Sequence, residues 1–269
     1  MNMSQIEQVF SELRSRGRKA FLPFITAGDP DLDFTAEIIR ELAKRGCTMC
    51  EVGIPYSDPI ADGPIIQASY TRALDKKIKV ADIFATIHRV SRQIQMPLIT
   101  MVSYAIVLRH GLEQFVAEAK AAGFAGAIVP DLLVEESEPL SRICRRENFS
   151  LIQLVTPTTP RARAILIANR STGFLYYVSV TGITGERRDL PPELIENVAW
   201  LRSQTDLPIC IGFGISTPEH VKMVAPVADG VIVGSALVRR IADANSKPRS
   251  QVVQAIGDLA ANLMAALDE

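Results

Sequence analysis

Eight short apolar runs alternate with amphipathic stretches along almost the whole chain, and this alternation limits the possible folds more than any other feature. The runs are rich in isoleucine, valine and leucine, which is typical of strands in a parallel sheet that is buried on both faces. The predicted strands are residues 20–26, 48–52, 98–102, 126–129, 151–155, 174–180, 208–212 and 230–233.

The stretches between these runs have the pattern of surface helices, and a polar, helix-periodic stretch precedes the first run. The predicted helices are residues 34–45, 81–95, 111–122, 135–147, 160–169, 193–203, 218–225 and 251–267. The pattern predicts one α/β domain over residues 1–269, a (β/α)8 or TIM barrel with an extra N-terminal helix. A doubly wound open sheet is the alternative, but Thr-Ala-Gly-Asp-Pro after the first strand is not its glycine-rich turn.

Charge and composition exclude several classes of function. The formal net charge is −1 without a basic stripe, so we expect no nucleic-acid partner. We expect a cytoplasmic protein without a membrane partner, because neither a spanning segment nor a signal peptide is evident. Cys47 and Cys50 form a CxxC, but we expect them on opposite faces of a strand. His88, His110 and His220 lack chelating spacing, so no metal site is expected.

Two carboxylates mark the end of the second predicted strand. Glu51 lies at the end of residues 48–52, and Asp62 follows in a loop rich in proline. Strand alternation puts Met49 and Glu51 on one face, which would point Glu51 into the mouth of a barrel. Burial raises the pKa of a carboxyl group, and a more solvated neighbour allows separate acid and base roles. The structural alternative is an ordinary turn with a buried glutamate.

Three glycine-containing loops follow the last three predicted strands, where barrels commonly bind phosphate. They are residues 181–188, residues 212–216 and the pair Gly234-Ser235, in which Ser235 is expected to cap a helix. The loop at 181–188 is also long and has glycine hinges, which suits a mobile lid. Each loop alone could be an ordinary turn, but their joint occurrence predicts a phosphate site.

Other barrel chemistries lack their essential groups in this sequence. None of the eight lysines lies at the C-terminal end of a predicted strand, so no Schiff-base lysine is available. A metal-dependent aldolase needs clustered ligands, and no serine–histidine pair stands out. Acid–base chemistry by Glu51 and Asp62 on a small phosphorylated molecule remains. Possible walls for an apolar ring are Phe24, Tyr104, Tyr176 and Phe213.

Several segments, in order along the chain, resemble the tryptophan synthase α subunit family. They are LPFITAGDP at 22–30, EVGIPYSDPIADGP at 51–64, TGITG at 181–185, GFGIS at 212–216 and GSA at 234–236. The resemblance covers nearly the whole chain, and the second segment is long and specific. It implies a (β/α)8 barrel that cleaves indole-3-glycerol phosphate into indole and glyceraldehyde 3-phosphate without a cofactor.

The resemblance also implies roles for single residues and a partner. Glu51 and Asp62 match the catalytic carboxylates of the family. The other matches are to phosphate-binding positions (Gly185, Gly214, Gly234 and Ser235), to positions near the substrate (Phe24, Tyr176 and Phe213) and to the lid threonine that contacts the catalytic aspartate (Thr184). The family α subunit pairs with a pyridoxal-phosphate β subunit in an α2β2 assembly, and indole passes between them.

The sequence departs from the family where the third predicted strand ends. The family usually has Tyr-Tyr-Asn-Pro there, whereas this chain has Ser-Tyr-Ala-Ile at 103–106. A second departure is Leu133 in place of the proline of Pro-Asp-Leu-Pro. The first lies where the family contacts its β subunit. Three alternatives to an α subunit that works with a β subunit stay open. They are a stand-alone lyase, a regulatory barrel that binds the ligand without turnover, and another phosphate-binding barrel of the same pathway.

Overall fold

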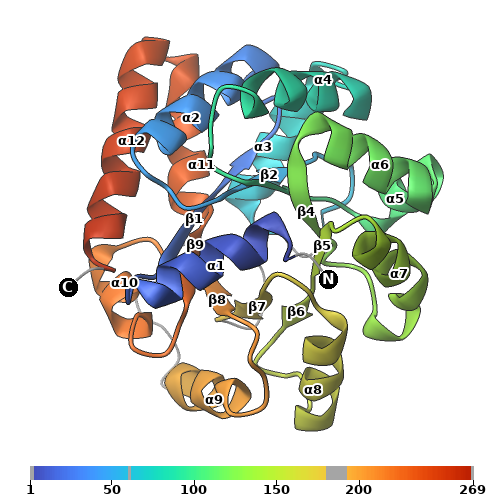
Figure 1. The fold of residues 1–269 in the computed structure, drawn as a ribbon. Helices are drawn as coiled ribbons and strands as arrows, with labels where there is room; N and C mark the ends of the chain where they lie inside the picture. The colour runs from blue at the N-terminus through green and yellow to red at the C-terminus, as the bar shows by residue number, and fades with distance from the viewer. Residues whose placement is uncertain (1–2, 60–61, 180–192, 268–269) are drawn as a thin grey trace.

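A computed structural model describes residues 3–59, 62–179 and 193–267 as a nearly closed barrel of parallel strands surrounded by helices (Figure 1). The strands are β1 (Ala20–Thr26), β2 (Cys50–Gly53), β3 (Leu98–Met101), β4 (Phe124–Ile128), β5 (Ser150–Ile152), β6 (Leu154–Val155), β7 (Leu175–Val178), β8 (Ile209–Gly212) and β9 (Gly230–Val233). Each strand pairs in parallel with its neighbour, and β1 pairs with β9. The predicted α/β barrel is therefore confirmed.

The two ends of the sheet meet within a single segment of the chain, at the position of the fifth barrel strand. The order of the sheet is β5-β4-β3-β2-β1-β9-β8-β7-β6, so its two ends, β5 and β6, are consecutive in the sequence. The prediction of one continuous strand over residues 151–155 is wrong, because Gln153 separates β5 from β6. β5 pairs only with β4 and β6 only with β7, and the break lets one segment serve both neighbours.

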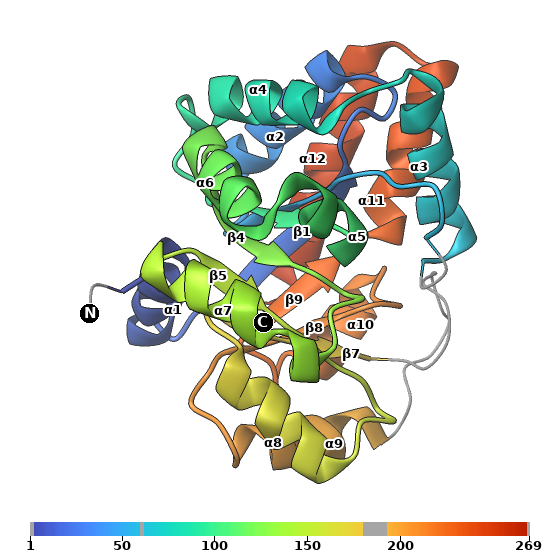
Figure 2. The ribbon, with the colours of Figure 1, turned by 90° about the vertical axis from the view of Figure 1, so that its right-hand side faces the viewer.

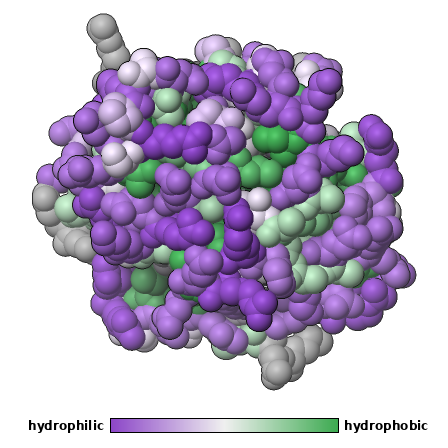
Figure 3. All heavy atoms as spheres, turned by 90° about the horizontal axis from the view of Figure 1, so that it is seen from above, coloured by the Kyte–Doolittle hydropathy of each residue, from purple (hydrophilic) through white to green (hydrophobic). Residues whose placement is uncertain are grey.

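Helices cover the outside of the barrel and one of its ends. They are α1 (Gln5–Ser15), α2 (Leu32–Lys44), α3 (Pro64–Asp75), α4 (Val80–Ser91), α5 (Tyr104–His110), α6 (Leu112–Ala122), α7 (Glu138–Arg146), α8 (Arg161–Arg170), α9 (Glu193–Arg202), α10 (Pro218–Val224), α11 (Ser235–Ala242) and α12 (Arg249–Ala265). Short 3-10 turns lie at Val134–Glu136 and Asp243–Asn245. None of the helices in the described ranges is long and apolar enough to cross a bilayer, and Figure 3 shows a mainly hydrophilic face with small, separate hydrophobic groups.

The extra N-terminal helix closes the end of the barrel where the strands begin. Ser4 and Glu7 form a capping box that starts α1. Ile6 and Phe10 are buried against the barrel interior, where Phe10 lies 5.8 Å from Phe174 between ring centroids. Figure 2 shows α1 at the opposite end of the barrel from the loop that leads into α3. The other end of the barrel is therefore the one available for a site.

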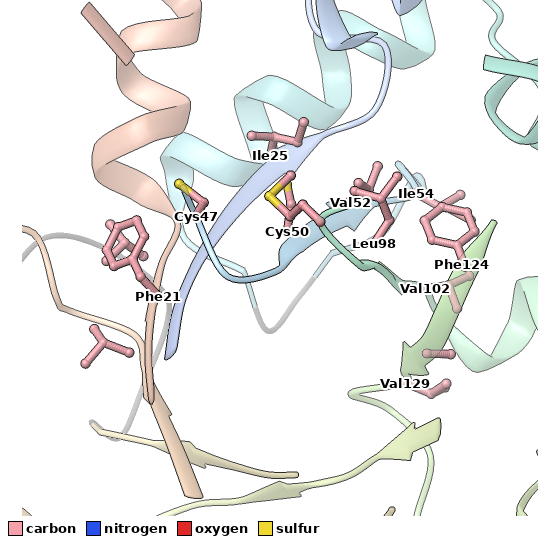
Figure 4. Packing of buried hydrophobic residues seen from close by; sticks show 14 of the residues in the cluster. Phe21, Ile25, Cys47, Cys50, Val52, Ile54, Leu98, Val102, Phe124 and Val129 are labelled. Carbon is pink, nitrogen blue, oxygen red and sulfur yellow. The ribbon is translucent and has the colours of Figure 1, made fainter. Parts of the chain in front are cut away.

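The buried hydrophobic residues form two clusters, one on the inner face of the sheet and one on its outer face. Met49 belongs to the interior cluster, whereas Cys50 and Val52 pack outward under the helices (Figure 4). This confirms the alternation that was expected to point Glu51 inward. The expectation for the CxxC pair is wrong, since Cys47 lies in the same outer cluster as Cys50. Strand alternation does not apply there, because β2 begins only at Cys50.

Candidate active site

Glu51 projects from the inner face of β2 into the barrel, beside Phe24 of β1 and Ile99 of β3 in the register of the sheet. Its exposed fraction is 0%, and neither carboxyl oxygen has a hydrogen-bond partner among the described residues. Burial raises the pKa of Glu51 well above its usual value. An ionised carboxylate without a partner is costly in such a place, so burial favours the protonated form of Glu51.

Asp62 is the second carboxyl group and has a wetter environment. It lies in the loop after β2, one residue before Gly63, the N-cap of α3. Its main-chain N–H donates to the carbonyl of Pro59 over 3.0 Å, and the side chain is half-buried. Partial burial raises the pKa of Asp62 to about 6, so it is mainly ionised at neutral pH. Two carboxyl groups in different environments, one completely buried and one half-buried, therefore line one cavity.

A cavity at the C-terminal ends of the strands brings these carboxyl groups together with most of the predicted site. It is lined by Phe24, Glu51, Asp62, Ile66, Met101, Tyr176, Phe213, Gly214, Ile215, Ile232, Gly234 and Ser235. Except for Tyr104, every predicted site residue in the described part of the chain lines this cavity. Thr184 and Gly185, with the rest of the predicted lid at 181–188, lie outside the described residues.

Aromatic side chains form one wall of the cavity. Tyr176 of β7 meets Phe213 edge to face, with 5.8 Å between the ring centroids and 76° between the planes. The absence of a side chain at Gly53 makes room for the opposite wall, because a Cβ there would lie 2.6 Å from the Phe24 ring. The cavity therefore has flat apolar surfaces beside the two carboxyl groups.

The glycine loops after β8 and β9 form the remaining side of the cavity. The predicted cap is wrong by one residue: Gly234 is the N-cap of α11, and Ser235 is the first helical residue. The Gly234 position provides no side-chain cap, so the first N–H groups of α11 are available for an anion beside Gly214 and Ser235. Among the described residues that line the cavity there is no lysine or arginine. These residues offer a phosphate neutral donors and the helix terminus.

A larger cavity adjoins the first. The volume of the first cavity is about 40 Å³, whereas that of its neighbour is about 570 Å³. The two share Asp62, Met101 and Phe213. Gln153, at the break between β5 and β6, also lines the larger cavity, and its buried amide Nε2 has no partner in the described ranges. The combined space has the size of a pocket for a small organic ligand.

The structure corrects the prediction that Tyr104 is a possible wall for an apolar ring. Residues 104–110 form helix α5, and Tyr104 lines neither of the two cavities, so it is not a wall of this site. The Asp131 carboxylate holds the start of α5, since it accepts from the Ser103 hydroxyl (2.7 Å) and the Tyr104 N–H (2.8 Å). Val107 is completely buried, whereas the Leu108 side chain is 55% exposed.

Sequence reasoning missed α3, which contributes Ile66 to the cavity and Tyr70 to its larger neighbour. A signal was present. Pro64 directly after Gly63 is a favoured first helical residue. Ile66, Ser69, Tyr70 and Ala73 are buried, and their spacing is that of one helix face. The helix is missing from the prediction because the loop was interpreted through its carboxylates alone.

No cluster of metal-ligating side chains occurs in the portion of the chain that the structure describes. The fold and the site together define a class: (β/α)8-barrel proteins equipped for acid–base chemistry on a small ligand with an apolar part and an anionic part.

Comparison with known proteins identifies the family. The model of the family "Tryptophan synthase alpha chain" matches residues 10–267. The chain is 54% identical to the tryptophan synthase alpha chain of Rhodopirellula baltica and 44% identical to that of Rippkaea orientalis, each match covering 99% of both chains. The crystal structure of tryptophan synthase subunit alpha from Legionella pneumophila matches with a TM-score of 0.90 and 35% identity, over 99% of both chains. The chain belongs to the tryptophan synthase alpha chain family.

Proposed function

We propose that the chain is the α subunit of a tryptophan synthase and that it cleaves indole-3-glycerol phosphate into indole and glyceraldehyde 3-phosphate. Membership of the family supports the reaction. The observation that carries the site assignment is the completely buried Glu51 carboxyl group, which has no described partner and faces the same cavity as Asp62. Burial of such a carboxyl group lowers the stability of the folded chain. A role for this group in the reaction of the substrate accounts for its presence in the cavity.

Asp62 is proposed to bind the indole nitrogen. Its ionised carboxylate accepts a hydrogen bond from the ring N–H and stabilises the positive charge that develops when the ring is protonated. The edge-to-face pair Tyr176 and Phe213, with Phe24 opposite, supplies apolar surfaces for the ring. The larger neighbouring cavity, which shares Asp62, gives the ring the necessary volume.

Glu51 is proposed to carry the proton through the whole cycle. It first donates its proton to the ring carbon that bears the glycerol chain. The resulting carboxylate then takes the proton of the adjacent hydroxyl group as the carbon–carbon bond breaks. The electron pair of that bond returns to the ring, so indole and an aldehyde are released and Glu51 is protonated again. Acid–base help of this kind contributes about 10²–10⁴-fold.

The phosphate is proposed to lie at the start of α11. Gly214, Gly234 and Ser235 line the same cavity as the carboxyl groups and place main-chain N–H groups at a helix terminus. Thr184 and Gly185 keep their predicted roles, as lid residue and phosphate ligand, within this proposal. No cofactor is required, because the indole ring holds the electrons of the broken bond. The single catalytic domain over residues 1–269 and the cytoplasmic location stay predictions.

The β subunit is proposed to bind the rim around the cavity mouth. Two exposed groups project there: Asp58 in the loop after β2, and Leu108 on α5. Because Val107 is buried on α5, Leu108 rather than Val107 is available to a partner. Titration with the cognate β subunit should produce a complex and faster indole release. A chain that stays monomeric and gains no activity at about micromolar partner is a stand-alone lyase.

Purified protein incubated with indole-3-glycerol phosphate tests the reaction itself. We expect release of indole and glyceraldehyde 3-phosphate in equal amounts. Binding without release would identify a regulatory barrel and contradict the proposal. Neither binding nor release would indicate another phosphate-binding barrel.

A further inference from the structure

Asp62 is fixed to α3 by a side chain for which the proposed mechanism has no role. The Gln67 amide Nε2 donates to the main-chain carbonyl of Asp62 over 2.6 Å and to that of Pro59 over 3.3 Å. A side-chain amide nitrogen carries two N–H protons, so one can serve each carbonyl. Pro59 also accepts from the Asp62 N–H, which closes a turn at this point. Gln67 therefore holds both ends of that turn to the first part of the helix.

The helix that carries Gln67 is itself anchored to the end of β1. Ser69 and Thr26, both buried, share a hydrogen bond of 2.6 Å between their hydroxyl oxygens. One turn further along, Arg72 donates twice to the carboxylate of Asp29, over 2.8 Å and 2.6 Å. Bidentate pairs of this kind fix both distance and orientation. Gln67 thus connects the Asp62 turn to a helix whose position relative to the barrel is already set.

We propose that Gln67 is a positioning residue, whose side-chain amide fixes the main chain of Asp62 so that its carboxylate faces the indole nitrogen. This inference rests on the proposed function. Gln67 does not line the cavity and touches no reacting atom, so it acts through Asp62 alone. An exposed side chain without core contacts can ordinarily be replaced with little effect on stability. Gln67 is exposed, but it differs from such a side chain because its amide donates two hydrogen bonds.

The effect on the reaction follows from geometry. Displacement of a reacting group by about 1 Å can cost up to about 10²-fold in rate. Loss of the Gln67 bonds frees the turn without removing the carboxylate, so we expect about a 10-fold fall in kcat. The phosphate site lies on other elements, after β8 and β9, so KM should change by less than about 3-fold.

The dependence of kcat on pH distinguishes a positioning role from a purely structural role, which would leave that dependence unchanged. The groups near Asp62 are Glu51 on β2, which lines the same cavity, Tyr56 in the following loop, Tyr70 on α3 and Tyr176 on β7. Burial raises the pKa of each of them, so the three tyrosines keep their protons where Asp62 loses its own, and Glu51 titrates above its ordinary range. A freed turn exposes Asp62 to water, which lowers its pKa from about 6 toward its ordinary value. The acid limb of kcat should therefore move to lower pH.

The test compares Gln67→Ala and Gln67→Glu with the control Gln93→Ala in the full chain. Gln93 is also exposed, its side-chain oxygen accepts from Arg40 of α2, and it lines neither of the two cavities. Indole release is measured from about pH 5 to about pH 8. We expect both Gln67 variants to lose kcat and to shift the acid limb, with Gln67→Glu at least as impaired because its carboxylate cannot donate. Gln67 variants that match the control in both quantities would overturn the proposal.

A second measurement separates failure of this inference from failure of the proposed reaction. If the wild-type chain releases no indole, the reaction is wrong, but the position of Asp62 still leaves a signature. Titration of the Asp62 carboxyl carbon by NMR should give a lower pKa in Gln67→Ala than in wild type and Gln93→Ala. Equal pKa values in the three proteins would contradict the positioning role whatever the reaction.

Discussion

Two buried carboxyl groups lie at the same rim of the barrel, and only one of them has a partner among the described residues. Asp29, after β1, is 1% exposed and accepts two hydrogen bonds from Arg72. Glu51, on β2, is 0% exposed and accepts none from the described residues. Burial is equal in the two places, so burial alone does not mark a functional residue. The lack of a described partner does mark Glu51 as a functional residue, because it leaves this carboxyl group able to exchange a proton with a substrate.

The strongest way to break this comparison is Glu51→Gln. The amide has nearly the same shape but cannot transfer a proton, so kcat for indole release should fall by about 10²–10⁴-fold. The free energy of unfolding should stay equal or rise, because a buried acid is replaced by a neutral amide. A variant that keeps more than about a tenth of wild-type turnover would show that another group is the acid.

Asp29→Asn should lower stability more than it lowers turnover. It leaves Arg72 without its charged partner at a site where the Asp29 side chain is almost completely buried. Breaking a buried pair costs about 3–5 kcal/mol, and the Arg72 side chain, 28% exposed, places this one near the low end at about 3 kcal/mol. Denaturant unfolding measures the loss. Unchanged stability with lost turnover would mean that Asp29, too, acts in the reaction.

Ser235→Asp adds a third carboxylate to the rim, this time beside the proposed phosphate. The new charge repels the anion at the start of α11, so KM for indole-3-glycerol phosphate should rise by about 10-fold or more. Ser235→Ala is the matched control, since it removes the hydroxyl without adding charge. Steady-state kinetics of both variants decide the matter, and an unchanged KM in Ser235→Asp would place the phosphate elsewhere.

Asp62 is intermediate between the two buried carboxyl groups and should make a small pH-dependent contribution to stability. Its folded pKa of about 6 is raised above its ordinary value of 3.8, so the folded state holds a proton that the unfolded state releases between these values. Stability should therefore fall as pH rises from about 4 to about 6, by about 1 kcal/mol for this partly exposed group. Unfolding of Asp62→Asn against pH should lack that part of the fall. An identical slope in both proteins would contradict the raised pKa.

The sequence predicted the barrel because each strand has a clear apolar signature that needs no knowledge of its neighbours. It also predicted that Glu51 points inward, since alternation along a strand is a local property. The break at Gln153 could not be predicted in this way, because it is imposed by the closure of the barrel. The Asp29–Arg72 pair joins residues 43 positions apart, and the sequence holds no local signal for it.

The most direct test of the central claim is the protonation state of Glu51 at neutral pH. Infrared difference spectra between wild type and Glu51→Gln at about pH 7 isolate the carbonyl stretch of this one carboxyl group. We expect a band of a protonated acid in wild type that is absent from the variant, because burial without a partner keeps the proton in place. Carboxylate bands in its stead would show that Glu51 is ionised, and would contradict its role as the acid that starts the reaction.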